Sequence, residues 1–156
     1  MVKNIAAGLC RVDPDHAAVY RRNESAFSAE LCKLTDEAVR LKEQVSGKNV
    51  VIQHGIFNYL ARLLGLNVAA EIQHEGVFPS AAEMRKLTEL IRSRKAAVIF
   101  TEPQYSSQIA RTLARECGIK LCHLDPLSGG PENPPADHYV SVMQENLSKI
   151  RSALER

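Results

Sequence analysis

The stretch "NVVIQHGIFNYLARLLG", residues 49–65, joins two patterns that together indicate the fold. Its first part is a short apolar run of the kind expected for a buried strand, and this run stops at His54. Gly55 follows, and apolar residues then recur at helical spacing. The pattern predicts a strand over 49–54 and a helix over 56–64, with an imidazole between them.

Short apolar runs and amphipathic segments alternate in the same way farther along the chain. Further strands are predicted over residues 67–73, 96–102 and 119–125, and further helices over residues 81–94, 106–117 and 138–156. Ser80 and Glu83 form a capping-box pattern at the start of one of these helices. Strands that are apolar on both faces are typical of parallel sheets covered by helices, joined by right-handed crossovers. The predicted fold class is therefore α/β, a four-stranded, mostly parallel sheet with helices on both faces.

A long helix is predicted ahead of the sheet. Asp13 and Pro14 supply a cap residue followed by a proline at the first helical position. Apolar residues then recur at gaps of three, four and seven, which predicts one helix over residues 14–45. We expect residues 1–46 to form a backbone or linker helix region and residues 47–156 to form an α/β lobe.

Composition limits the classes of protein and partner. The 156 residues are 45% apolar and 24% charged, which is typical of a globular protein with one domain or lobe. The net charge of +2 is spread along amphipathic stretches, so nucleic acid is not an expected partner. The N-terminal residues lack the apolar segment and cleavage site of a signal peptide, and nothing in this chain is expected to export it.

The four cysteines are Cys10, Cys32, Cys117 and Cys122, and no two of them form a CxxC pair. We interpret them as free and mostly buried thiols. Cys117 and Cys122 are the pair expected to form a disulfide in an oxidising environment.

Candidate functional groups stand at the ends of the predicted strands. In an open parallel sheet the carboxyl ends of the strands share one edge, and ligands bind along it. The predicted strand ends are Gln53–His54, Gln73–His74, Thr101–Glu102 and Leu124–Asp125.

His54 has two readings, a structural histidine that caps the next helix, or a metal ligand or acid–base group. The predicted position of Glu102 and Asp125 on the same edge favours the second. Glu102 is interpreted as a group that hydrogen-bonds or orients a ligand, or as a structural part of the turn "TEPQYS". His74 could also reach this edge, whereas His16, His123 and His138 are expected to be packed or solvated.

Evidence for catalysis is thin. The sequence contains neither a glycine-rich phosphate loop nor a GxSxG nucleophile elbow, and Cys122 lies within a predicted strand. No catalytic residue is assigned. Two alternatives to a binding protein stay open: a small metal-dependent α/β hydrolase that uses His54, Glu102 and Asp125, and a metal-free interaction domain that works through its long helix.

Two segments carry a resemblance to a known family. "VVIQHGIFNYLARLLGL" and "IFTEPQYSSQIARTLARECGIKLCHLDPLSGG" resemble, in order and spacing, the C-terminal lobe of the periplasmic or surface-anchored zinc- and manganese-binding proteins of ABC metal importers. Members of that family have two α/β lobes joined by a long helix, and the metal lies between the lobes. The resemblance implies a receptor that delivers zinc to an ABC permease in the membrane, on the periplasmic or extracellular side.

The resemblance also implies a set of ligands. His54 matches the first metal ligand of the C-terminal lobe and Asp125 the second, while Glu102 matches a position next to a ligand rather than a ligand itself. A histidine at the first position favours zinc over manganese, because manganese prefers oxygen donors.

The chain departs from the family pattern in one respect. A full member has a signal peptide and an N-terminal lobe with two further histidine ligands, whereas this chain opens at residues that resemble the region of the joining helix. Two donors cannot complete a tetrahedral zinc site, so we expect weak binding of zinc or no bound metal. We also expect self-association into a homo-oligomer, because apolar surface that the N-terminal lobe covers would be exposed.

Overall fold

The computed structural model describes residues 1–72 and 79–155. The chain divides into two compact units, Met1–Glu37 and Ala38–Arg156, and the division falls inside a helix. The boundary expected from the sequence, after residue 46, coincides instead with the end of that helix, and it stays a prediction.

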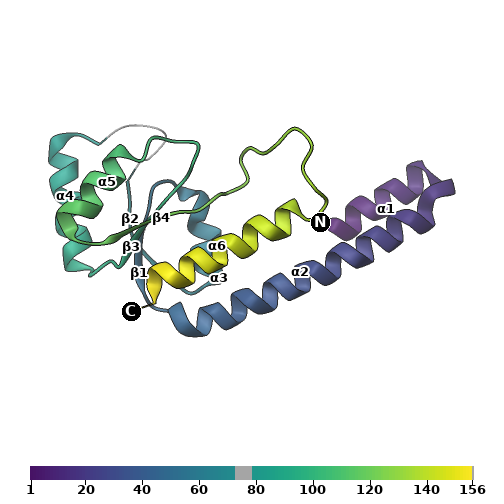
Figure 1. Cartoon of the computed structure of the whole chain (residues 1–156), viewed down its shortest axis with the longest axis horizontal. Coiled ribbons are helices and arrows are strands. Elements are labelled where there is room, and N and C mark those ends of the chain that lie inside the picture. Colours follow the sequence, from purple (N-terminus) through teal and green to yellow (C-terminus); the bar gives the residue numbers. More distant parts are fainter. Residues whose placement is uncertain (73–78, 156) are drawn as a thin grey trace. The chain divides into compact units, whose positions relative to one another are not determined.

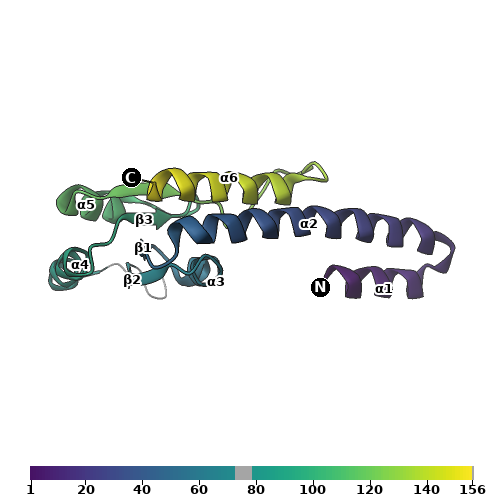
Figure 2. The ribbon, with the colours of Figure 1, turned by 90° about the horizontal axis from the view of Figure 1, so that it is seen from below.

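The N-terminal unit is a pair of helices. α1 (Val2–Val12) is followed by the short 3₁₀ turn η1 (Pro14–His16) and by α2 (Ala17–Val45), whose first turns belong to this unit. Figure 2 shows α1 folded back beside the start of α2. The prediction of one regular helix from residue 14 is wrong at its first turn, where three residues form a 3₁₀ turn instead.

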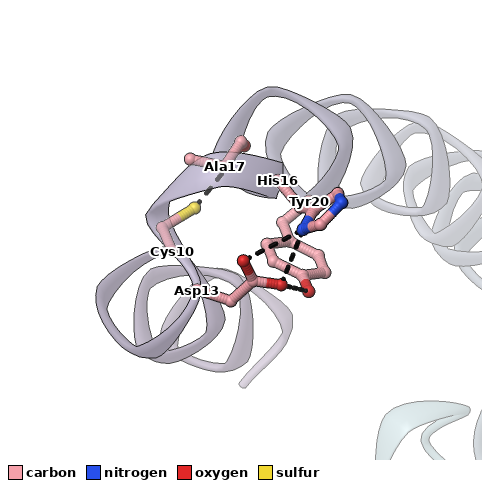
Figure 3. A network of polar contacts seen from close by, with 5 residues as sticks. All are labelled: Cys10, Asp13, His16, Ala17 and Tyr20. Carbon is pink, nitrogen blue, oxygen red and sulfur yellow. Dashed lines mark hydrogen bonds and ion pairs between the residues drawn. The ribbon is translucent and has the colours of Figure 1, made fainter.

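Side chains at this turn explain its geometry. Asp13 makes no side-chain cap to the helix start; its carboxylate instead accepts a hydrogen bond of 2.6 Å from the Tyr20 hydroxyl and lies 2.9 Å from His16 Nδ1. These two bonds hold the pKa of the Asp13 carboxyl below its ordinary value, and the bond from Tyr20 has the larger effect. Figure 3 shows the Tyr20 hydroxyl and the His16 ring both directed at the Asp13 carboxylate, and the Cys10 thiol directed at the Ala17 carbonyl.

The second unit is built on a four-stranded sheet (Figure 1). Its strands are β1 (Asn49–Ile52), β2 (Asn67–Glu71), β3 (Val98–Thr101) and β4 (Lys120–His123), in the order β2-β1-β3-β4. All three neighbouring pairs are parallel. The predicted α/β class and parallel sheet are confirmed.

Helices cover both faces of this sheet. They are α3 (Asn58–Leu63), preceded by the 3₁₀ turn η2 (Gly55–Phe57), α4 (Ala81–Ser93), α5 (Gln108–Cys117) and α6 (His138–Leu154). Figure 1 shows α4 and α5 on one side of the sheet and α3 and α6 on the other. The expected capping box is present, since Ser80 Oγ accepts from Glu83 N–H and Glu83 accepts from Ser80 N–H. Among residues 1–72 and 79–155, no helix has the length and apolar character needed to cross a bilayer.

The alternation of the strands explains the two faces. Val51 and Ile99 belong to the core on the side of α4 and α5, together with Ile91 and Leu113 of those helices. Because successive side chains of a strand point to opposite faces, Val50 and Ile52 face the other side, and all three strand residues of the "VVI" run have no exposed surface. This double burial is why the strands read as continuous apolar runs.

Each strand is shorter than predicted. β1 ends two residues before His54, β3 one residue before Glu102 and β4 two residues before Asp125. The three residues therefore lie on loops just past the strands and not within them. The predicted strand end at Gln73 and His74 lies outside the described residues.

The prediction of mostly buried cysteines is wrong. Only Cys122 is buried, Cys10 and Cys117 are partly exposed, and Cys32 is exposed; all four are free. The suggested Cys117–Cys122 disulfide is absent because the two thiols belong to different surroundings. Cys117 lies 3.9 Å from the Thr88 carbonyl of α4, whereas Cys122 lines a hollow with Lys149 of α6.

Candidate metal centre

The strand order singles out one place on the carboxyl edge of the sheet. The chain leaves β1 to form β2 on one side, then crosses to form β3 on the other side of β1. Such a reversal separates the connections that follow adjacent strands, and open α/β sheets bind ligands at this point. The residues that follow β1 and β3 are thus the first to inspect, and they include His54 and Glu102.

His54 and Glu102 are in contact. His54 Nδ1 lies 2.8 Å from Glu102 Oε1, and the two side chains are 17% and 2% exposed. An ionised carboxylate can only accept a hydrogen bond, so this contact favours a proton on Nδ1, and in the neutral imidazole the lone pair is then on Nε2. Histidines that bind metals are commonly held in this way by a carboxylate on the opposite nitrogen.

The loop between β3 and α5 supplies a second contact to His54. The Tyr105 ring lies with its centroid 4.4 Å from that of the imidazole, tilted by 52°. The buried Gln53 side chain donates a hydrogen bond of 3.0 Å from Nε2 to the Ser106 carbonyl, which ties this loop to the end of β1. His54, its carboxylate partner and its aromatic neighbour are thus held by one connected set of contacts.

Asp125 is held differently, through its backbone. Asn146 of α6 is 2% exposed; its Oδ1 accepts from Asp125 N–H at 3.0 Å, and its Nδ2 donates to the Asp125 carbonyl at 2.7 Å. The carboxylate oxygen Oδ1 of Asp125 accepts from Leu127 N–H at 2.8 Å. This bond occupies one of the two carboxylate oxygens of Asp125.

Asp125 also lines a cavity of about 300 Å³ between α3 and α6. The walls of the cavity are mostly apolar and include Phe57, Leu60, Tyr139 and Met143. One wall starts at Ile56, two residues after His54. The cavity is thus lined both by Asp125 and by the turn that follows His54.

Gly55 lies close to the side chains of Asn58 and Glu71. A Cβ atom at this position would lie 3.2 Å from Asn58 Nδ2 and 3.4 Å from Glu71 Oε1, tighter than or at the limit of ordinary contact. Glu71 thus places a further carboxylate beside the residue that follows His54. Sequence reasoning passed over Glu71 because it placed the end of β2 two residues later.

Two of the remaining histidines have other partners. His123 is exposed and its Nδ1 lies 2.6 Å from Thr101 Oγ1, while His16 is exposed in the N-terminal unit. Within residues 1–72 and 79–155 there is no group of three or more His, Cys, Asp or Glu side chains that could hold a metal ion. His54 and Asp125 follow β1 and β4, on the two sides of β3.

Two residues that shape the edge were missed from the sequence. Tyr105 lies in the quoted turn but was given no role, since nothing in the spacing predicts which ring reaches His54. Asn146 offered a visible signal, because it is a polar residue in register with the apolar stripe of α6.

Comparison with known proteins adds the family. Residues 1–153 match the family model ZnuA, described as zinc-uptake complex component A, periplasmic. The zinc-binding lipoprotein AdcA of Streptococcus pneumoniae is 32% identical over 159 residues, covering 100% of this chain and 32% of that protein. The high-affinity zinc uptake system protein ZnuA of Bacillus subtilis is 31% identical, covering 98% of this chain and 49% of that protein.

Solved structures agree with the fold. The substrate-binding protein FpvC of Pseudomonas aeruginosa, in complex with Mn²⁺, matches with a TM-score of 0.82 and 32% identity, over 97% of this chain and 55% of that one. The chain therefore spans roughly a third to a half of the curated relatives it matches.

Proposed function

The chain belongs to the ZnuA family of zinc-uptake components, and from this premise we propose that it is the C-terminal lobe of a zinc receptor serving an ABC permease. Residues 47–156 form the metal-binding lobe in this proposal, and residues 1–46 form the connection to an N-terminal lobe. The family is one of metal-binding transport receptors. Zinc is the cargo of such a receptor and not a cofactor for a reaction.

We infer that His54 and Asp125 donate to the ion through Nε2 and Oδ2. The contact between His54 Nδ1 and the buried Glu102 carboxylate carries the proposal, because it presents the imidazole with a free lone pair at the carboxyl edge of the sheet. Glu102 orients the ligand and does not bind the ion. Asp125, like His54, is proposed as a ligand: its Oδ1 accepts a hydrogen bond from Leu127 N–H, so Oδ2 is the oxygen proposed to bind the ion.

Zinc suits this pair of donors better than manganese. Imidazole nitrogen is a borderline donor that suits Zn²⁺, whereas carboxylate and water oxygens suit Mn²⁺. Zinc takes three or four protein donors, and this lobe offers two. We therefore expect this chain by itself to bind zinc weakly, with the other positions filled by water or by donors from another lobe.

Isothermal titration with zinc chloride tests the ligand pair. His54→Ala and Asp125→Ala should each weaken binding by at least about tenfold, because each removes one of two donors. His123→Ala is the matched control for the histidine, because His123 is the last residue of β4, and Asp137→Asn is the control for the carboxylate. Both controls should bind zinc as the unaltered chain does.

Two results would contradict the proposal. Unchanged zinc binding in His54→Ala would show that His54 is not a ligand. Tight one-to-one binding by a monomer, lost in His54→Ala, would contradict the expectation that two donors bind weakly.

Location and further partners follow from the family proposal. The receptor would work outside the cytoplasmic membrane, as the periplasmic family description and the lipoprotein relatives suggest. α3 exposes Tyr59, Leu63 and the preceding Ile56, with Tyr59 85% exposed, and such apolar surface favours association. Sedimentation analysis at high concentration should reveal self-association, and a clean monomer would count against it.

A further inference from the structure

Asn146 is out of place in its helix. It lies on the buried stripe of α6, between Met143 and Ile150, where every other position of the predicted stripe is apolar. It is 2% exposed, while its neighbour Leu147 is 4% exposed. Burying an amide there is costly unless the amide is hydrogen-bonded, so its partners indicate why it is there.

Both strong partners of Asn146 belong to one residue, Asp125. Oδ1 accepts from the Asp125 N–H at 3.0 Å and Nδ2 donates to the Asp125 carbonyl at 2.7 Å. The side-chain amide therefore pairs with the backbone of Asp125 as a residue of a neighbouring strand would.

The position of β4 explains the need for this pairing. β4 is an edge strand, with β3 on one side and no strand on the other within the described sheet. Leu124 N–H donates to the Thr101 carbonyl on the β3 side. Since successive N–H groups of a strand alternate in direction, the N–H of Asp125 points away from β3, where Asn146 receives it.

We propose that Asn146 is a positioning residue for zinc binding, acting through Asp125. With both backbone groups of Asp125 held by α6 and its Oδ1 held by Leu127, the orientation of the carboxylate is fixed and Oδ2 is directed by the backbone. Loss of the amide frees the backbone of Asp125 and spreads the positions of Oδ2. This inference rests on the proposed function, because it assigns Asn146 a role only if Asp125 is a ligand.

A purely structural role for Asn146 makes a different prediction. In that case the loss of Asn146 lowers stability. Zinc affinity then changes no more than it does in another variant that loses the same amount of stability. Ile150→Val supplies the comparison, because Ile150 has no exposed surface, lies one turn farther along α6, and makes no hydrogen bond to Asp125.

The experiment is a double-mutant cycle in the full chain, with zinc chloride titrated against ¹H–¹⁵N spectra. Asn146→Ala should weaken zinc binding by about tenfold, as loss of a group that orients a ligand typically does. The effect should vanish in the Asp125→Ala background. Asn146→Ser, whose hydroxyl can replace only one of the two bonds, serves as the milder variant should Asn146→Ala not fold. Amide exchange at Asp125 should speed up in either variant and stay slow in Ile150→Val.

The outcomes separate the two hypotheses. If Asp125→Ala binds zinc as tightly as the unaltered chain, the proposed function fails and this inference fails with it. If Asp125→Ala weakens binding but Asn146→Ala and Asn146→Ser do not, only the inference is overturned. It is also overturned if Ile150→Val weakens zinc binding as much, or if the effect of Asn146 persists without Asp125.

Discussion

Two pairs of histidine and carboxylate occur in this molecule at nearly the same distance. His16 Nδ1 lies 2.9 Å from the Asp13 carboxylate, and His54 Nδ1 lies 2.8 Å from that of Glu102. The first pair is 66% and 39% exposed, the second 17% and 2%. Distance alone therefore does not rank the two contacts. Burial does, because water competes for the first pair and not for the second.

The two pairs also differ in what surrounds them. Asp13 divides its bonding between His16 and Tyr20 in a turn between two helices. Glu102 lies buried just past the end of β3 and contacts His54. The exposed pair helps to shape a turn, whereas the buried pair fixes the orientation and the proton of one ring.

Loss of the Glu102 carboxylate should have the largest effect. Glu102→Ala leaves the His54 N–H without its acceptor at a buried position, which should cost about 2 kcal/mol of the free energy of unfolding. Zinc affinity should fall by about ten- to a hundredfold. Urea unfolding and zinc titration measure the two effects. Glu102→Gln keeps an acceptor oxygen and should unfold close to the unaltered chain; equal losses in both variants would show that the bond to His54 is not the cause.

Removal of the Tyr105 ring should have a smaller effect on the same pair. The ring contributes an aromatic contact with His54, and its loss in Tyr105→Ala should cost about 1 kcal/mol of the free energy of unfolding. Tyr105→Phe retains the ring and should preserve the stability. If Tyr105→Phe were as destabilised as Tyr105→Ala, the hydroxyl and not the ring contact would be the stabilising group.

The exposed pair can be tested through the pKa of Asp13. The bonds from Tyr20 and His16 stabilise the ionised carboxyl and lower its pKa, so their contribution is present above the ordinary pKa and is lost as the pH falls through the lowered one. The hydroxyl of Tyr20 has the larger effect. An NMR titration should find the pKa of Asp13 raised more in Tyr20→Phe than in His16→Ala; the opposite order would contradict the geometry of the turn.

The smallest effect is expected for His16→Ala. Because both partners are exposed, the midpoint of urea unfolding should stay within the scatter of repeated measurements. A destabilisation equal to that of Glu102→Ala would show that burial does not distinguish the two pairs.

Much of the fold was predictable because it depends on local patterns. The double burial of the "VVI" run, the capping box at Ser80 and the order of strands and helices all follow from sequence spacing. The exact strand ends were not predictable, because they depend on backbone hydrogen bonds between segments far apart in the sequence. The bond from Leu124 N–H to the Thr101 carbonyl is an example.

The candidate site was predictable only in part. The carboxyl edge brings His54 and Glu102 into contact because the parallel strands β1 and β3 share their direction. Which groups hold them depends on tertiary contacts between distant segments, and so the amide of Asn146 and the ring of Tyr105 were not found. Cys117 and Cys122 show the same limit, since five residues of separation said nothing about the different surroundings of their thiols.

The bond from Gln53 to the Ser106 carbonyl has a consequence for how an ion would be received. It joins the loop bearing Glu102 and Tyr105 to the segment that leads from β1 to His54, so in the proposed site the fold itself would hold the histidine and its carboxylate partner in place. A preorganised site loses little conformational entropy on binding. The affinity of the proposed site for zinc would then depend mainly on the number of donors that contact the ion, and on whether another lobe supplies the donors that this one lacks.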